Sequence, residues 1–282
     1  MLVKVRDSVG VPLLDVHEKP GQSGASKAPP AADAASAFST LYFGTQWQPS
    51  PIDAAQSGEP SRQTVVLFAP DEASVDAYRA GLAASGGDTT TLIAALPGEA
   101  YVQVDDSRYQ LNASSRVDFE TLLSSLRKRS DATLHLCFAW SALPGTDNDG
   151  LSAEARTMQA LDRGVYAFLS LSQAIIAQKC EADVRLQYLY FNASETSQPH
   201  NEAIQGFATI LRAECPKLSC KVLEIVTPHA GFDAAAVSAI ALEFRHDNKA
   251  LAVRYRDGKR YLRRIEDCPE PVPAADRCTS AR

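Results

Sequence analysis

Residues 64–72, Thr64-Val-Val-Leu-Phe-Ala-Pro-Asp-Glu72, decide the fold. The first five residues are a short apolar run, which is typical of a strand buried on both faces of a parallel sheet. Asp71 is a favourable N-cap for a helix that we expect to end before Gly86-Gly87. The stretch therefore predicts a strand, a tight turn and a helix.

The alternation of strands and helices continues to about residue 256. Apolar strands are expected at 133–140, 184–191 and 221–226, and short strands at 92–93, 101–104 and 109–111. Helices are expected at 118–129, 152–178, 201–214 and 233–244, and a hairpin at 250–255 and 260–264 around Asp257-Gly258. Because this alternation requires crossover connections, we predict an α/β fold, a truncated Rossmann-like parallel sheet with helices on both faces.

The long helix at 152–178 has a helical period of residues expected to face the core. These residues are Leu161, Val165, Phe168, Leu169, Ser172, Ile175 and Ile176.

Composition excludes several classes of function. The chain has 282 residues, 45% of them hydrophobic, with a net charge of -6 and a pI near 5.4. An acidic chain lacks the basic stripe of a nucleic-acid binder. No apolar run approaches the roughly 20 residues that span a bilayer, and the first residues lack the apolar core of a signal peptide. We therefore expect a cytoplasmic protein without membrane or nucleic-acid partners.

The cysteines do not indicate a metal site. Six are scattered without a Cys-x-x-Cys pair: Cys137, Cys180, Cys215, Cys220, Cys268 and Cys278. A zinc site or a disulfide framework would need closer clustering. No bound metal is expected.

Composition shifts divide the chain into four parts. Residues 1–18 contain two short extended stretches, at 2–6 and 11–16, and predict a hairpin. Residues 19–40 are rich in Ala, Pro, Gly and Ser and predict a linker. Residues 41–267 form the main domain and begin with an aromatic-rich segment, Tyr42 to Trp47. Residues 268–282 predict a disordered tail.

The turn after the first strand lacks the features of a dinucleotide site. Such folds bind pyrophosphate over a Gly-x-Gly-x-x-Gly turn, where the backbone approaches the phosphates closely. Here Ala69-Pro70-Asp71-Glu72 has no glycine, and Pro70 lacks an N–H. Asp71 and Glu72 place two carboxylates where phosphate charges would lie, and the Asp71 cap uses the N–H groups at the helix start. We expect no cofactor-binding residues here.

Short-chain dehydrogenases place a catalytic serine at the end of a later strand and Tyr-x-x-x-Lys on the next helix. Ser194 lies near the first position, and Asn201 and Gln205 fall about where tyrosine and lysine would belong. Neither amide is a useful proton donor. Ser194 is interpreted as a turn or cap residue. The sequence Tyr255-Arg-Asp-Gly-Lys259 is interpreted as chance, because Asp257-Gly258 reverses the chain between the two residues.

Two further groups have a structural and a functional interpretation. His135 and Cys137 share one face of a strand and could form a thiol–imidazole pair, although core packing is the simpler interpretation. The hairpin at 250–264 is basic and could bind an acidic carrier protein, or its charges could protect an edge strand from aggregation. Its basic residues are Arg254, Arg256, Lys259, Arg260, Arg263 and Arg264.

Several segments together resemble the structural subdomain of modular polyketide synthase ketoreductases, of the trans-acyltransferase type. They are Tyr42-x-x-x-x-Trp47-x-Pro49, the strand at 64–68, Gly164-Val-Tyr-Ala-Phe-Leu-Ser-Leu-Ser-Gln-Ala174, Gln205-Gly-Phe-Ala-Thr-Ile-Leu-Arg-Ala-Glu-Cys-Pro216 and Leu251-Ala-Val-Arg-Tyr-Arg-Asp-Gly-Lys-Arg-Tyr261. The resemblance covers about residues 41–267, and 206–216 is its most specific part. The hairpin at 1–18 is similar to the C-terminal edge of a dehydratase domain.

This resemblance implies a short-chain dehydrogenase-like half without catalytic residues or cofactor. In that family, such a half braces a second half that carries NADPH and the serine, tyrosine and lysine catalysts. The implied partners are therefore a catalytic ketoreductase half, neighbouring synthase domains and, through the basic hairpin, an acyl carrier protein. The aromatic segment at 42–47 and the hairpin at 250–264 are expected docking surfaces, because they have no evident internal partner. The alternatives are a pseudo-ketoreductase scaffold, an atypical NADPH-dependent short-chain dehydrogenase and a free-standing carrier-protein module.

Overall fold

The computed structural model describes residues 5–6, 39–40, 42–52, 63–85, 90–129, 133–141, 152–178, 183–193, 197–215, 217–228, 231–246 and 250–268. The chain divides into two compact units, and each is described by itself. Unit 1 comprises Met1–Trp47 and Arg263–Arg282, and unit 2 comprises Gln48–Leu262.

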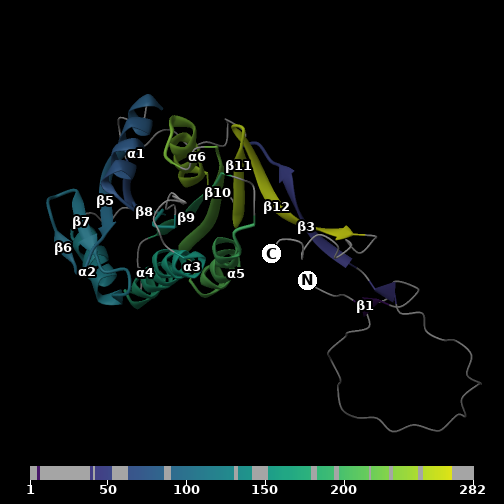
Figure 1. Cartoon of the computed structure of the whole chain (residues 1–282), viewed down its shortest axis with the longest axis horizontal. Coiled ribbons are helices and arrows are strands. Elements are labelled where there is room, and N and C mark those ends of the chain that lie inside the picture. Colours follow the sequence, from purple (N-terminus) through teal and green to yellow (C-terminus); the bar gives the residue numbers. More distant parts are fainter. Residues whose placement is uncertain are drawn as a thin grey trace, which may run out of the picture. The chain divides into compact units, whose positions relative to one another are not determined.

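Unit 2 holds the alternating strands and helices (Figure 1). Its strands are β4 (Gln63–Phe68), β5 (Thr90–Pro97), β6 (Val102–Gln103), β7 (Arg108–Leu111), β8 (Leu134–Phe138), β9 (Val184–Asn192), β10 (Leu218–Val226), β11 (Ala252–Arg256) and the first residues of β12 (Lys259–Cys268). Its helices are α1 (Glu72–Ala84), α2 (Arg116–Arg127), α3 (Ala153–Ala160), the π-helix η2 (Leu161–Tyr166), α4 (Ala167–Ala177), α5 (Pro199–Glu214) and α6 (Ala234–Arg245).

The sheet confirms the predicted fold class. Within the described residues, its order is β3-β12-β11-β10-β9-β8-β4-β5-β7-β6, where β3 spans Tyr42–Pro49. In this spatial order, every strand from β11 through β4 to β7 pairs in parallel with the next. β6 is antiparallel to β7, and β12 is antiparallel to β11. The chain order reverses between β4 and β8, which is the topological switch point where ligands bind in open α/β sheets.

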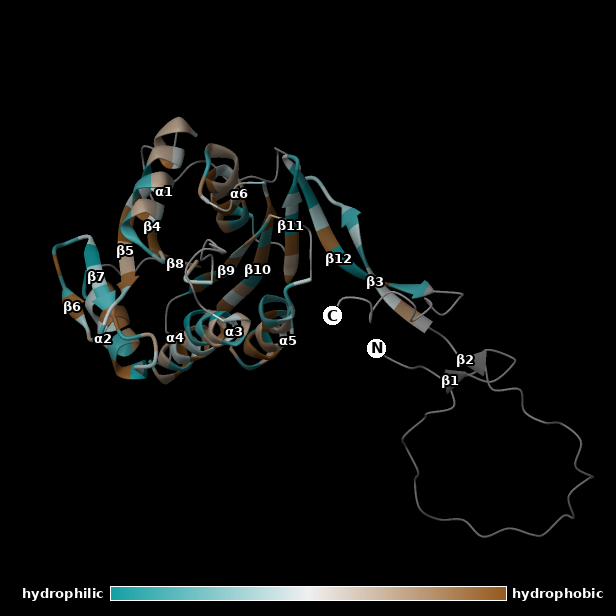
Figure 2. Cartoon of the chain, viewed as in Figure 1, coloured by the Kyte–Doolittle hydropathy of each residue, from teal (hydrophilic) through white to brown (hydrophobic). Residues whose placement is uncertain are grey.

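Helices cover both faces of this sheet. Figure 1 shows α1 and α6 on one side and α2, α4 and α5 on the other. Alternate residues of each strand enter the two cores: Val66 and Phe68 face one cluster, and Val65 and Leu67 face the other. The strands between the helix layers are correspondingly hydrophobic (Figure 2). This double burial explains the continuous apolar runs in the sequence.

The helix predicted for 152–178 is present, but it is not one continuous α-helix. The chain forms α3, the π-helical η2 and α4 in succession. A π-helical turn takes more residues than an α-helical turn and therefore rotates the helix that follows. Of the residues predicted to face the core, Phe168, Ser172 and Ile175 are buried, whereas Leu169 is 37% exposed and Ile176 is 42% exposed.

Unit 1 contains the outer part of a β-ladder and a short strand pair. β1 (Val5–Arg6) pairs antiparallel with β2 (Ser39–Thr40). The second stretch of the predicted 1–18 hairpin, most of the 19–40 linker and the 269–282 tail lie outside the described residues, so these divisions stay predictions. Residues 42–47 of β3 and 263–268 of β12 also belong to unit 1, and there Arg263 Nη2 donates to Thr45 Oγ1 at 3.3 Å.

The structure corrects the expectation that the two predicted docking surfaces lack a pairing partner within the chain. Both the segment at 42–47 and the hairpin at 250–264 were expected to lack an internal partner. Instead β12 lies between β3 and β11, and β11 pairs with β10. The sequence predicted the hairpin of β11 and β12 but not the pairing of β12 with β3 or of β11 with β10, because no short turn joins those strands.

Candidate functional site

The turn between β4 and α1 is the first part of the candidate site. Ala69 and Pro70 are buried, and the Ala69 N–H donates to the Ala95 carbonyl at 3.1 Å. The Asp71 carboxylate accepts from the Ser74 N–H at 2.7 Å, as the predicted N-cap requires. A negative charge thus lies at the positive end of the α1 dipole, at the place where a Rossmann-type turn would hold a phosphate.

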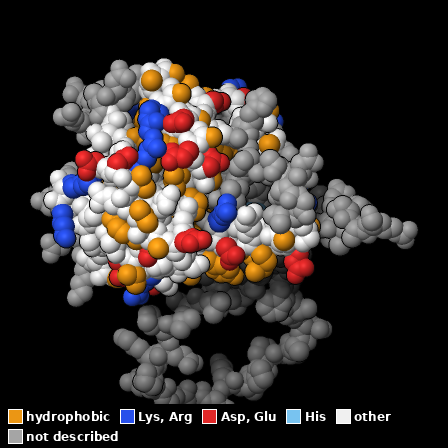
Figure 3. Space-filling model, turned by 60° about the vertical axis from the view of Figure 1, so that its left-hand side comes forward, with side chains coloured by type: hydrophobic (Ala, Val, Ile, Leu, Met, Phe, Trp, Pro, Cys, Tyr) orange, Lys and Arg blue, Asp and Glu red, His pale blue; other side chains and the backbone are white. Residues whose placement is uncertain are grey.

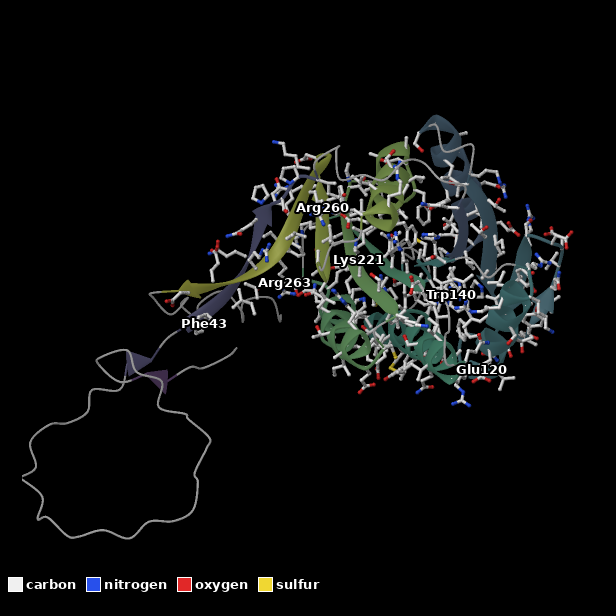
Figure 4. The ribbon with its side chains drawn as sticks, turned by 180° about the vertical axis from the view of Figure 1, so that it is seen from behind. Phe43, Glu120, Trp140, Lys221, Arg260 and Arg263 are labelled. Atoms are coloured by element: carbon white, nitrogen blue, oxygen red, sulfur yellow. The ribbon has the colours of Figure 1, made fainter. Side chains whose placement is uncertain are left out.

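Trp140 fills the sheet end beside this turn. The chain continues from β8 past Ala139, whose N–H donates to the Phe68 carbonyl at 2.9 Å and so extends the β4–β8 pairing. The Trp140 side chain is completely buried, and its Nε1–H donates to the Ala95 carbonyl at 3.0 Å (Figure 4). One indole therefore bonds to β5 at the carboxyl ends of the two strands that flank the switch point.

Aromatic rings hold this indole in place. It lies edge-on to Phe68 at a centroid distance of 5.7 Å, and Phe119 and Phe138 lie 5.7 and 5.6 Å away. Tilted and edge-to-face pairs of this kind add to the free energy gained from burial. The α2 face of the switch point is therefore packed with side chains.

The helix that follows β9 carries amides instead of a tyrosine and a lysine. Asn201 is buried in the first turn of α5, where its Oδ1 accepts from the Tyr188 hydroxyl at 2.6 Å. Its Nδ2 donates to Gln198 Oε1 at 2.6 Å, and burial raises the pKa of the Tyr188 phenol. Gln205 is half-buried one turn later. Ser194 lies outside the described residues.

A buried acid was not predicted from the sequence. Glu224 lies in β10, where its Oε1 accepts from Asn192 Nδ2 at 2.8 Å. Arg254 forms a two-point contact with it, Nε to Oε2 at 2.9 Å and Nη2 to Oε1 at 3.1 Å. Burial and the nearby Glu224 carboxylate raise the pKa of Tyr190. The only sequence signal was a carboxylate inside an apolar strand, which burial permits only when the charge is paired.

Comparison with known proteins identifies the family. The family model described as beta-ketoacyl synthase-like, N-terminal, matches residues 63–242, which is more than half of the chain. The chain belongs to this family. No curated protein matches the sequence.

The fold of this family member is that of ketoreductase domains. It is similar to a solved structure that contains the adenylation, ketoreductase and pseudo-Asub domains of a keto acid-selecting NRPS module, with 21% identity and a TM-score of 0.66, over 80% of this chain and 18% of that chain. It is also similar to an N-terminal ketoreductase from the macrolactin assembly line, with 19% identity and a TM-score of 0.60, over 81% of this chain and 45% of that chain. Structures of A-type ketoreductases from a modular polyketide synthase match with 15% identity and a TM-score of 0.54, over 82% of this chain and 44% of that chain.

These comparisons confirm the expected ketoreductase resemblance at the level of the fold. The chain spans less than half the length of each of these three solved chains.

Two other sequence candidates of this beta-ketoacyl synthase-like chain lie in its core. His135 packs edge-on against Phe244 at 5.1 Å, and burial together with the Arg185 charge lowers its pKa to about 4. Burial raises the pKa of the Cys137 thiol, and the side chain is completely buried. A neutral imidazole and a protonated, enclosed thiol lack the properties of a catalytic pair.

The Tyr255-x-x-x-Lys259 sequence spans a turn, as expected. Asp257 and Gly258 have φ angles of 51° and 71°, and Tyr255 faces Arg260 across the hairpin. The Tyr255 hydroxyl donates to Glu243 Oε1 at 3.0 Å, whereas Lys259 is exposed. The tyrosine and the lysine thus lie on opposite strands.

The basic hairpin presents less charge than its sequence indicated. Arg260 is buried beside Glu243, and Arg254 is paired with Glu224. The exposed cations of this hairpin include Arg256, Lys259 and Arg264. Binding of a carrier protein by this hairpin stays a prediction.

No three His, Cys, Asp or Glu residues gather into a metal-binding group in the described ranges. Cys137 and Cys220 are buried and Cys215 is partly buried, whereas Cys180 and Cys278 lie outside the described residues. Among the helices that the structure describes, none combines the length and apolar composition needed to cross a bilayer.

Proposed function

We propose that this chain is the non-catalytic structural half of a ketoreductase in a polyketide-type synthase. It braces a catalytic half, or it serves as a pseudo-ketoreductase scaffold within a module. The shared fold and the fraction of the solved ketoreductases that the chain spans support this proposal. The chemistry of reduction, with NADPH, belongs to a separate catalytic half.

The packed switch point is the observation that carries the proposal. A pyrophosphate needs free N–H groups at a helix start and a backbone that it can approach closely. Here the Asp71 carboxylate occupies the start of α1, and Trp140 fills the neighbouring strand ends. A phosphate at this turn would be repelled by the negative charge of the Asp71 carboxylate. It would also have to displace the buried indole of Trp140.

The side chains in the first turns of α5 support the same function. Hydride transfer to a ketone requires a proton for the developing alkoxide, and a tyrosine beside a lysine would supply it. Asn201 instead uses its amide in hydrogen bonds to Tyr188 and Gln198. The buried phenol of Tyr188 has a raised pKa and donates to Asn201, so it is held as a structural group.

A hydrophobic strip on the helices is the proposed docking surface. Tyr166, Leu169 and Ile176 follow one side of η2 and α4 and are 50%, 37% and 42% exposed. Met158 on α3 and Ile210 on α5 are also exposed, by 50% and 55%. On the face that Figure 3 shows, hydrophobic side chains lie in small groups between charged ones. Exposed apolar residues that gather on one side of a helix are typical of a protein interaction site.

Co-purification tests the proposed function. We expect the full chain to elute as one complex with the catalytic ketoreductase half of the same synthase. Leu169→Glu combined with Ile176→Glu should abolish the complex, because both charges would be desolvated at the interface. Val117→Glu is the matched control, since Val117 is 63% exposed on α2 and lies outside the strip. Separate elution of the two wild-type chains would contradict the proposal.

A further inference from the structure

A buried cluster of charges joins four elements of unit 2 on the α6 face of the sheet. Glu243 of α6 lies at its centre and is 2% exposed. Lys221 of β10 reaches Glu243 Oε2 at 3.0 Å, and the Tyr255 hydroxyl of β11 donates to Oε1 at 3.0 Å. Arg260 of β12 donates through Nε to the same Oε1. Figure 4 shows Lys221 and Arg260 on the sheet, on β10 and β12, and β11 lies between these two strands.

Arg260 extends this cluster to a distant part of the chain. Its Nη1 donates to the Ser50 carbonyl at 3.0 Å, and the Ser50 N–H donates to the Arg260 carbonyl at 2.9 Å. Ser50 and Arg260 are 210 residues apart in sequence. One guanidinium therefore ties the segment that follows β3 to β12 and, through Glu243, to α6.

The two cations depend on Glu243 to different degrees. Besides the carboxylate, Lys221 Nζ donates to the carbonyls of Glu243 at 2.9 Å and His246 at 2.7 Å, at the end of α6. Those carbonyls are the negative end of the helix dipole and remain when the carboxylate is removed. Arg260, by contrast, has Glu243 as its counter-ion, and without it a buried guanidinium would lose the group that offsets its desolvation.

Lys221 and Arg260 differ in position in the sheet, and they would therefore respond differently to the loss of the Glu243 carboxylate. Lys221 lies on β10, which has β9 and β11 on its two sides, and cannot leave without unfolding the centre. Arg260 lies on β12, which pairs with β11 from Lys259 to Leu262. Loss of this short pairing would release Arg260 to water and leave the central strands intact.

We infer that Glu243 is a latch that holds residues 259–262 and Ser50 onto the sheet, so that this edge opens as a local unit. The inference concerns the edge only and does not rest on the proposed scaffold function. The latch also accounts for the conflicting effects on Glu243 itself: burial opposes its ionisation, but Arg260 and Lys221 together hold its pKa below the ordinary value.

Hydrogen exchange of the full chain, followed by mass spectrometry, tests the latch. In Glu243→Gln we expect exchange of the amides of residues 259–262 to accelerate at least about tenfold, with β9 and β8 amides unchanged. Arg260→Met should open the same residues, because it removes the outer partner while Glu243 keeps Lys221. It provides a second route to the same result if the Glu243 variant folds poorly.

Two matched variants serve as controls. Lys221→Met leaves the contact between Glu243 and Arg260 and should keep 259–262 protected. Glu224→Gln neutralises the other buried glutamate that contacts an arginine and should also leave 259–262 as in the wild type. Equal acceleration throughout β8, β9 and β12 in Glu243→Gln and Arg260→Met would overturn the inference, and so would unchanged exchange at 259–262.

Discussion

Asp71 and Trp140 act on the same end of the sheet by different physical means. Asp71 contributes charge, and it uses the Ser74 N–H that a bound anion would otherwise contact. Trp140 contributes volume, because its indole is completely buried and bonded to Ala95. Replacement of Asp71 alone would leave the indole, and replacement of Trp140 alone would leave the carboxylate. Under our proposal, neither change alone creates a cofactor site.

His135 makes stability depend on pH. Its pKa in the fold is about 4, because burial and then the Arg185 charge disfavour the imidazolium, against 6.5 in an unfolded chain. Between these values only the unfolded state binds the proton, so stability is full above pH 6.5 and falls as the pH drops towards 4. The expected loss is roughly 2–4 kcal/mol. This loss of stability is measured as the difference in urea-unfolding free energy between the wild type and His135→Gln at several pH values. A difference that does not change with pH would contradict the lowered pKa of His135.

At the scale of elements, local pattern predicted the strand–helix alternation well. The apolar run at 64–68, the Asp71 cap and the Asp257-Gly258 turn each depend on neighbouring residues, and each is present. The π-helical turn at η2 was not predicted, since Leu161–Tyr166 contains no proline, and its charged residues Asp162 and Arg163 do not distinguish a π-helix from an α-helix.

Long-range pairing was the other part that sequence did not predict. Glu243 and Glu224 read as ordinary polar residues until the fold brings Arg260 and Arg254 beside them. The role of Trp140 was equally hidden, because a tryptophan at the end of an apolar strand does not show which neighbouring strand its N–H will reach.

Two helical glycines predict opposite effects of the same substitution. A Cβ on Gly81 in α1 would lie 2.5 Å from Val237 Cγ2 and 3.2 Å from the Asp233 carbonyl of the α6 N-cap, so Gly81→Ala should push α1 from α6. We expect a loss of about 1–3 kcal/mol. A Cβ on Gly206 in α5 would meet nothing within 4 Å, so Gly206→Ala should stabilise by about 0.5–1 kcal/mol. Thermal unfolding followed by circular dichroism measures both. A change in stability of the same sign in both variants would contradict the described packing of α1 against α6.

At the scale of the whole molecule, the chain retains the layered architecture of ketoreductase domains over less than half the length of the solved chains. Its aromatic side chains fill the core where the strand order reverses, and its most exposed hydrophobic residues include several on η2, α4 and α5. We propose that this architecture serves to present the helical strip to a catalytic half. Charges of both signs on the surface, with a net charge of -6, favour solubility of the unbound chain.

Isothermal titration of the purified full chain with NADPH tests the central proposal most directly, with a catalytic ketoreductase as the positive control. We expect no saturable heat up to about 1 mM cofactor, because the start of α1 is capped by Asp71 and the adjoining strand ends are filled by Trp140. Saturable binding with a micromolar Kd, weakened by the further carboxylate of Ser74→Asp at the start of α1, would contradict the account.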